Sequence, residues 1–157
     1  MKTFYLIVLL SFVFSGLSAQ SAKEEVDFMQ SVFGMEKKAL VAEFVKPNDA
    51  QKDAFWQLYD EYETARKELG KKRVELLLKY EENFDNLSHD LAAGLLKEIL
   101  ALAKKNDKLV AGYVKKVAKA TDPVVAMQFH QVEMYVMSEI RLALSEGLPF
   151  PEIKNDR

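Results

Sequence analysis

The chain has 157 residues, of which 49% are hydrophobic and 29% are charged, and its 22 basic and 24 acidic residues give a formal net charge of −2. This composition is that of one ordinary globular domain, and it excludes a disordered or collagen-like chain. The chain contains no cysteine, which excludes disulfides, thiolate nucleophiles and cysteine-ligated metals. It also lacks the basic excess that a nucleic-acid partner would require.

The first nineteen residues have the pattern of a secretory signal peptide. A positively charged start, Met1-Lys2-Thr3, precedes an apolar run over residues 4–14, and small residues follow up to Ala19. The apolar run is shorter than a membrane span requires. We therefore expect cleavage after Ala19, with no stable membrane insertion afterwards; an uncleaved N-terminal anchor is the alternative. We expect a single domain over residues 20–147 and an extended polar tail over residues 148–157.

Apolar residues recur with helical periodicity over residues 22–146, and no stretch alternates with period two for long enough to predict a strand. The fold class is therefore all-α. The first predicted helix ends before Pro47, because proline disfavours helical geometry in the residue ahead of it. Its apolar stripe comprises Val26, Met29, Phe33, Leu40 and Phe44.

The second predicted helix is unusually long. Asn48 and Gln51 have the spacing of a capping box, so the helix is expected to begin near Asp49 and to run to Phe84. At a rise of about 1.5 Å per residue it would span roughly 54 Å. Its packed seam comprises Phe55, Tyr59, Tyr62, Leu69, Leu76, Tyr80 and Leu87.

A turn at Asn86-Leu87-Ser88 leads into the third predicted helix, for which Ser88 is the expected N-cap. Residues 121–123 end this helix and start a fourth, which runs to about Glu146 before Gly147. The expected buried stripe of the third helix comprises Leu91, Leu95, Ile99, Leu102, Leu109, Tyr113 and Val117.

These four helices predict an elongated bundle built on a long central helical hairpin. A chain of this length cannot cover two such helices on every side. Some apolar surface must remain open, and we expect it to form a homodimer interface, a binding site for other proteins, or both.

Motifs for catalysis and metal binding are missing from the sequence. It has no nucleophile elbow, glycine-rich phosphate loop or His-Glu-x-x-His motif. His89 and His130 are isolated, and His130 precedes Glu133 in the order opposite to that of di-iron bundles. We expect His130 to be an ordinary interior or boundary residue. We therefore predict a protein that is not an enzyme and has no cofactor, no catalytic residues and no metal site.

Three features are candidates for binding other proteins: two arginines on the seam, a lysine-rich face and the fourth helix. Arg66 and Arg73 fall on the apolar seam, where they either pair with carboxylates such as Glu133 or Glu139 or line an open concave face that attracts acidic and partly unfolded segments. Seven lysines between Lys97 and Lys119 form a basic face that is either simply solvated or attracts acidic proteins or an anionic envelope surface.

The fourth helix is apolar almost all round, so it is either a central packed helix or an adaptable, methionine-rich binding surface. The candidate partner-binding residues are Tyr59, Tyr62, Arg66, Arg73, Leu76, Tyr80, Met127, Met134 and Met137.

Short motifs along the chain resemble those of the Spy/CpxP family of secreted bacterial helical proteins, over most of residues 40–149. That family has Leu-Thr-x-x-Gln at helix starts, and the two similar stretches here are residues 47–51, followed by Phe55-Trp56-Gln57-Leu58-Tyr59, and residues 87–92. The capping positions of these motifs are Asn48, Gln51, Leu87 and Ser88. Phe129-His130-Gln131-Val132-Glu133 is similar to the final helix of one branch.

The resemblance implies a periplasmic, ATP-independent chaperone that binds partly unfolded proteins of the cell envelope, without nucleic acid. The alternative that the same family implies is a regulatory module that binds and represses a single sensor protein.

Overall fold

The computed structural model describes residues 34–151. Within that range the chain is all-helical with no strand, as the sequence predicted, and it contains four α-helices. Residues 34–44 form the first helix, and we call residues 34–45 the N-terminal segment. The others are α2 (Lys52–Glu82), α3 (His89–Ala120) and α4 (Pro123–Gly147), and a short 3₁₀ turn, η3 (Phe84–Asn86), precedes α3.

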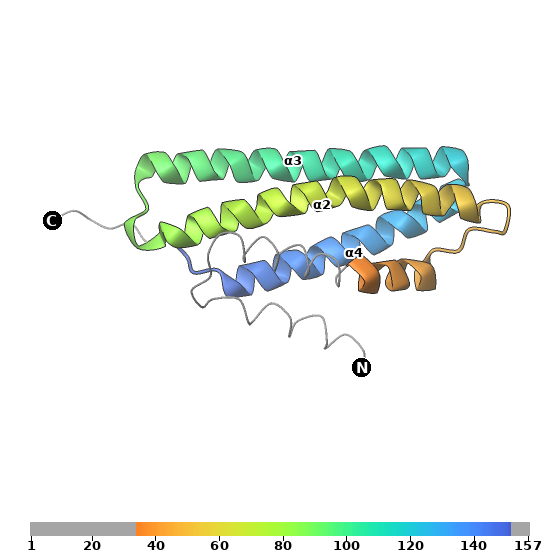
Figure 1. Cartoon of the computed structure of the whole chain (residues 1–157), viewed down its shortest axis with the longest axis horizontal. Coiled ribbons are helices and arrows are strands. Elements are labelled where there is room, and N and C mark those ends of the chain that lie inside the picture. The colour runs from red at the N-terminus through yellow and green to blue at the C-terminus, as the bar shows by residue number, and fades with distance from the viewer. Residues whose placement is uncertain (1–33, 152–157) are drawn as a thin grey trace.

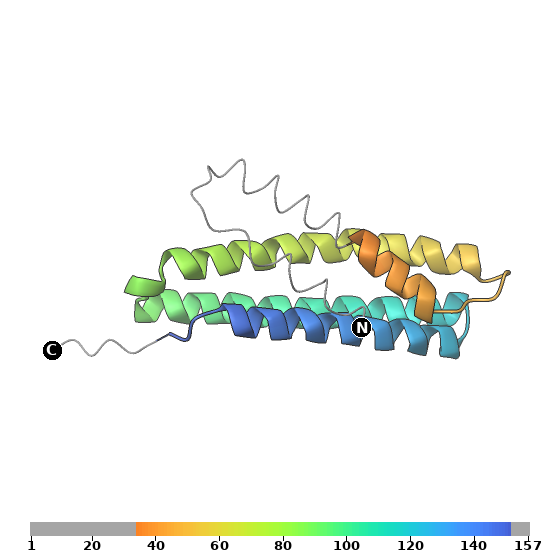
Figure 2. The same cartoon turned by 90° about the horizontal axis from the view of Figure 1, so that it is seen from below.

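The four helices form an elongated bundle (Figure 1). α2 and α3 have 31 and 32 residues, and at about 1.5 Å per residue each is close to 47 Å long. α3 packs along α2 on one side and along α4 on the other. The N-terminal segment, coloured orange, lies against the end of the bundle where α2 begins and α3 ends (Figures 1 and 2).

Capping residues set the helix boundaries. Asn48 and Gln51 form the predicted reciprocal pair: each backbone N–H donates to the other's side-chain oxygen at 3.1 Å. α2 begins at Lys52, three residues later than predicted, because this pair closes a turn ahead of the helix.

The other two helices also begin after side-chain N-caps, of which Ser88 was predicted from the sequence. Ser88 Oγ accepts a hydrogen bond from Leu91 N at 3.3 Å, which confirms the predicted N-cap of α3. Asp122 Oδ1 accepts from Val124 N and Val125 N at the start of α4, and these backbone hydrogen bonds lower the pKa of Asp122. α4 ends at Gly147, one residue beyond the predicted end.

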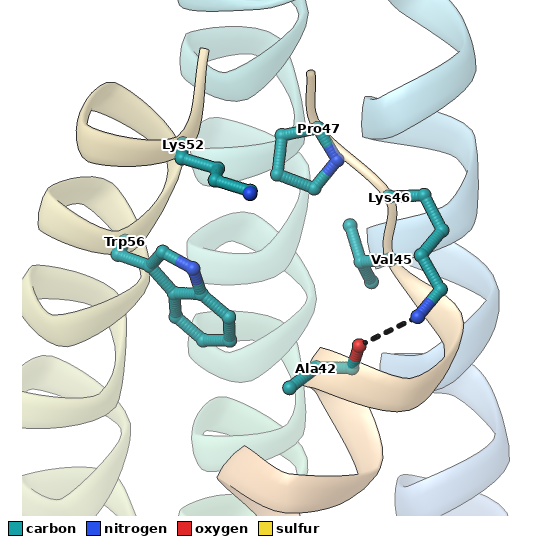
Figure 3. Close-up of a pocket in the computed structure, with 6 residues that line it drawn as sticks. All are labelled: Ala42, Val45, Lys46, Pro47, Lys52 and Trp56. Carbon is teal, nitrogen blue, oxygen red and sulfur yellow. Dashed lines mark hydrogen bonds between the residues drawn. The ribbon is translucent and has the colours of Figure 1, made fainter. Parts of the chain in front are cut away.

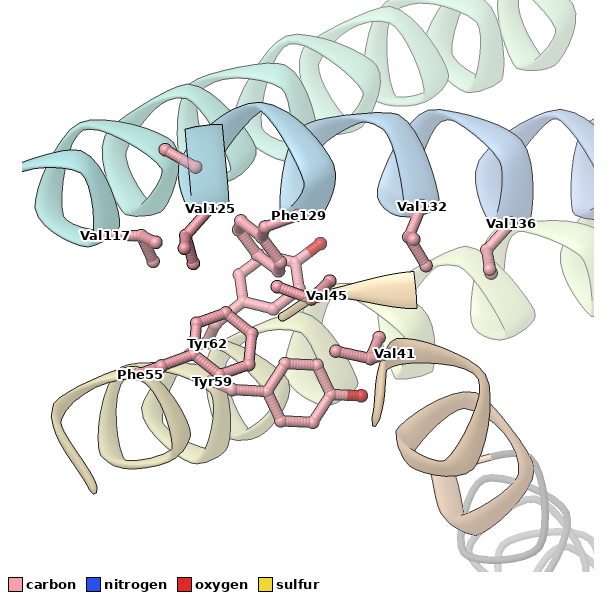
Figure 4. Close-up of a cluster of buried hydrophobic side chains, with 11 residues drawn as sticks. Val41, Val45, Phe55, Tyr59, Tyr62, Val117, Val125, Phe129, Val132 and Val136 are labelled. Atoms are coloured by element: carbon pink, nitrogen blue, oxygen red, sulfur yellow. The ribbon is translucent and has the colours of Figure 1, made fainter. Parts of the chain in front are cut away.

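Aromatic side chains from α2 and α4 form the centre of the core (Figure 4). The ring centroid of Phe129 lies 6.2 Å from Phe55, 6.5 Å from Tyr59 and 5.3 Å from Tyr62, each in edge-to-face geometry. Val41 and Val45 complete this cluster from the N-terminal side. Phe55, Tyr59 and Tyr62 are buried, as the predicted seam requires.

The far half of the seam is less covered. Leu69, Leu76, Tyr80 and Leu87 are half-buried. Tyr80 donates a hydrogen bond from its hydroxyl to Pro149 O at 2.8 Å, which ties the end of α2 to the non-helical residues that follow α4. Residues 152–157 of the predicted tail lie outside the described range.

Two predicted stripes need correction. Phe44 is 54% exposed, and the N-terminal segment instead buries Lys37, Val41 and Val45, which are spaced four residues apart. The apolar pattern alone missed this face because its first position is a lysine. Ile99 on α3 is 44% exposed rather than buried.

Several predictions for the N-terminus lie outside the described residues. They are the signal peptide over residues 1–19 and the positions of Val26, Met29 and Phe33. No helix in the described part of the chain is long and apolar enough to cross a membrane.

Candidate functional site: an outer trough and a buried ion cluster

A shallow trough runs between α3 and α4, and we call it the α3–α4 trough. Its volume is about 410 Å³. Five of its ten lining residues are aliphatic or methionine, and the other five are four charged residues and a histidine. The lining residues are Asp107, Val110, Ala111, Val114 and Lys115 from α3, and His130, Glu133, Met134, Met137 and Arg141 from α4.

The trough contains two of the three methionines that the sequence marked as candidates. Met134 is 46% exposed and Met137 is half-buried, so both present sulfur and methyl groups to a bound side chain. Met127 is 64% exposed on the same helix but does not line the trough. The sequence reasoning did not single out Val110 and Val114, although their four-residue spacing places both on one face of α3.

Charged groups flank the apolar floor. Arg141 Nη2 lies 3.9 Å from Asp107 Oδ1 across the trough, and both side chains are more than half exposed. Lys115 lines the same wall, and the lysines of α3 from Lys97 to Lys119 are all exposed. His130, predicted as an interior or boundary residue, is exposed at this surface.

A second feature is a buried group of four charged side chains, which we call the ion cluster: Lys37, Glu63, Arg66 and Glu133. Lys37 Nζ lies 2.7 Å from Glu63 Oε1, and 2.7 Å and 2.8 Å from Oε1 and Oε2 of Glu133. One ammonium therefore joins two carboxylates that belong to α2 and α4.

The remaining members of the cluster are satisfied locally. Arg66 Nε and Nη2 donate to the Glu63 carboxylate at 2.9–3.1 Å. Tyr62 donates its hydroxyl to Glu133 Oε2 at 2.6 Å. Burial raises the pKa of Glu63, but Lys37 and Arg66 outweigh burial and hold that pKa below its usual 4.5.

The two seam arginines have different surroundings. Arg66 was expected to pair with Glu133 or Glu139 or to face an open surface. It is buried and bonds Glu63 on its own helix, whereas Lys37 is the residue that reaches Glu133. Arg73 is half-buried, and burial together with Arg141 and Arg66 lowers its pKa.

The structure separates the nine candidate binding residues. Tyr59, Tyr62 and Arg66 are buried, and the Tyr59 hydroxyl has no hydrogen-bond partner among the described residues. Arg73, Leu76, Tyr80 and Met137 are half-buried, and Met127 and Met134 are exposed. The two exposed candidates therefore lie on α4, and the half-buried ones are divided between α2 and α4.

A third feature is an open cleft of about 430 Å³ beside the start of α2, lined by Ala42, Val45, Lys46, Pro47, Lys52 and Trp56 (Figure 3). Its two lysines already have partners: Lys46 Nζ donates to Ala42 O, and Lys52 Nζ to Asp49 Oδ1. Both ammonium groups of the cleft are therefore engaged within the protein.

The described residues contain no group of three or more His, Cys, Asp or Glu side chains that could hold a metal ion. Comparisons with protein-family models, with curated proteins and with solved structures found no match for this chain.

Proposed function

We propose that the protein is a non-catalytic, ATP-independent chaperone of the bacterial periplasm that binds partly unfolded proteins in the α3–α4 trough. Residues 1–19 are its cleaved signal peptide, and residues 20–157 are the mature chain. In this proposal the chain belongs to the Spy/CpxP-like helical proteins, is built on a central hairpin of α2 and α3, and works as a homodimer without a cofactor.

The observation that supports this function is the composition of the trough. Met134 and Met137 are unbranched and polarizable, so they can adapt to side chains of different shapes. Apolar side chains exposed on α4 outside the trough, Val124 and Met127, extend the surface toward the start of the helix. An adaptable apolar strip of this kind suits many clients better than one ligand.

In this proposal the charged residues serve structure and client binding. Glu133 and Glu63 are held by Lys37, so their carboxylates are engaged within the protein. Arg141 and Lys115 stand at the edge of the trough, where they orient a client without reacting with it.

The test is suppression of aggregation. The mature chain should lower the light scattering of a chemically unfolded client at equimolar or lower ratios without ATP. Met134→Asp should weaken this effect, because it places a charge on the apolar wall. Leu100→Asp is the matched control, since Leu100 is equally apolar and 61% exposed but does not line the trough.

Absence of suppression at both low and physiological salt would overturn the chaperone proposal. The alternative regulator predicts a different result from a pull-down of envelope extract: one stoichiometric partner, where a chaperone would recover a heterogeneous set.

A further inference from the structure

The N-terminal segment is docked on the bundle through few side chains. Lys37, Val41 and Val45 are its fully buried residues, and Leu40 is half-buried. Figure 4 shows Val41 and Val45 facing the aromatic rings of α2 and the valines of α4. The segment therefore docks through one face of a short helix, on which the buried residues recur every four positions.

The site that binds this face is complementary to it in polarity and charge. Its walls are apolar: Phe55 and Tyr59 come from α2, and Phe129 and Val132 from α4. Glu63 and Glu133 contribute two buried carboxylates, and Arg66 neutralises one of them. Such a site requires a helix that carries one cation, with apolar residues one and two turns later. A helix with apolar residues alone would leave a carboxylate buried without a counter-charge.

The link from the segment to α2 is short and non-helical. Pro47 restricts Lys46 to extended geometry. Lys46 N donates to Gln128 Oε1 at 2.9 Å, and Gln51 Nε2 donates to Asp122 Oδ2 at 3.1 Å, so two hydrogen bonds join the link to α4 and its N-cap. The buried contacts of Lys37, Val41 and Val45 belong to the segment itself and would form equally well if the segment belonged to another copy of the chain.

We propose that the site between α2 and α4 also receives the N-terminal segment of a second copy, so that the protein dimerises by exchanging residues 34–45. Each copy places Lys37 between Glu63 and Glu133 of its partner. Lys37, Val41 and Val45 set the register together. A shift of one residue would place either Glu36 beside the two carboxylates, or Lys38 there with Ala42 and Lys46 in the two valine positions.

Exchange is favoured because the segment buries a small number of side chains. Local opening of so small an element is more frequent than global unfolding. An open copy exposes the apolar walls and leaves Glu133 without the Lys37 ammonium. Both effects raise the free energy of the open copy, so binding of a segment at the site is strongly favoured. At sufficient concentration the nearest suitable helix is the same segment of a neighbouring open copy.

The cysteine-free sequence makes the test direct. Lys38 and Asp60 form an exposed ion pair, with Nζ 2.6 Å from Oδ1, between the segment and α2. Lys38→Cys and Asp60→Cys would be prepared in separate mature chains, mixed, incubated and treated with a short bismaleimide. Exchange predicts a cross-linked heterodimer on a denaturing gel, in an amount that rises with protein concentration.

Two controls isolate the exchanged segment. In the first control, Asp85→Cys replaces Asp60→Cys. Asp85 lies beyond the far end of α2, at least about 33 Å along the helix from Asp60. The cysteine at position 85 should therefore cross-link to the cysteine at position 38 at least tenfold less. In the second, a synthetic peptide of residues 34–48 should compete with the cross-link, and the same peptide with Lys37→Met should not.

The proposal is overturned if the mixed chains give no heterodimer under conditions in which the double variant Lys38→Cys/Asp60→Cys cross-links within one chain. It is also overturned if the Lys37→Met peptide competes as well as the natural one. Both readouts are independent of chaperone activity, so failure here leaves the trough proposal standing.

Discussion

Replacing Lys37 by Met should destabilise the protein severely. The ion cluster has two cations and two carboxylates, and the substitution leaves one buried negative charge without compensation. Breaking a buried pair in this way costs about 3–5 kcal/mol. For a domain of this size, at roughly 4 °C per kcal/mol, the melting temperature should fall by about 12–20 °C.

Urea unfolding followed by circular dichroism at neutral pH measures this change. Lys38→Met is the matched control: the neighbouring lysine pairs with Asp60 at the surface, where an ion pair contributes about 0–1 kcal/mol. Adding Glu133→Gln to Lys37→Met restores neutrality and should recover about 1–3 kcal/mol. A loss below about 1 kcal/mol for Lys37→Met, or no recovery in the double variant, would refute this reasoning.

Four further changes test the rest of the structure. Phe129→Ala should cost about 3–5 kcal/mol in urea unfolding, because it removes a fully buried ring that contacts three others. The free energy of unfolding should decline as pH falls below about 4.5. The reason is that the lowered pKa of Glu63 in the folded protein stabilises the fold only while that carboxylate is ionised, so Glu63→Gln should flatten the decline. Arg73→Leu should leave the free energy of unfolding within about 0.5 kcal/mol of the natural value or raise it, since Arg73 is half-buried near other arginines; a clear loss would reveal a partner for its guanidinium. Ser88→Ala should cost about 1 kcal/mol by removing the cap of α3, whereas Ser88→Asp should retain it.

Periodicity and capping residues were enough to predict the helices. Phe55, Tyr59 and Tyr62 follow the steps of a packed seam, and each is buried. Asn48 and Ser88 cap their helices or turns because their side-chain oxygens lie close to unpaired backbone N–H groups. These signals are local, so they do not depend on how the helices pack.

The ion cluster was not predictable in the same way. Lys37 interrupts an apolar stripe, and hydrophobic periodicity treats such a lysine as an exposed residue. Its role depends on Glu63 and Glu133, which are 26 and 96 residues away in the sequence. Pairing over that separation is set by tertiary packing, which a pattern of one residue type does not encode.

The candidate binding surface was predicted in part. The methionines of α4 were singled out for their adaptability, and Met134 lies in the trough. Tyr59 and Tyr62 are candidates in the sequence because they share a seam with Arg66 and Arg73, which predicts either a packed core or an open binding face. The choice between those roles depended on the N-terminal segment, whose Val41 packs in the same core cluster as the two rings.

The most direct test of the proposed function is a nuclear magnetic resonance spectrum of the mature chain labelled at its methionine methyl groups. The titrant is a reduced, carboxymethylated protein that cannot refold. We expect the signals of Met134 and Met137 to shift or broaden, while that of Met35, which is 65% exposed on the N-terminal segment, stays in place. Unchanged signals at Met134 and Met137 would contradict client binding in the α3–α4 trough.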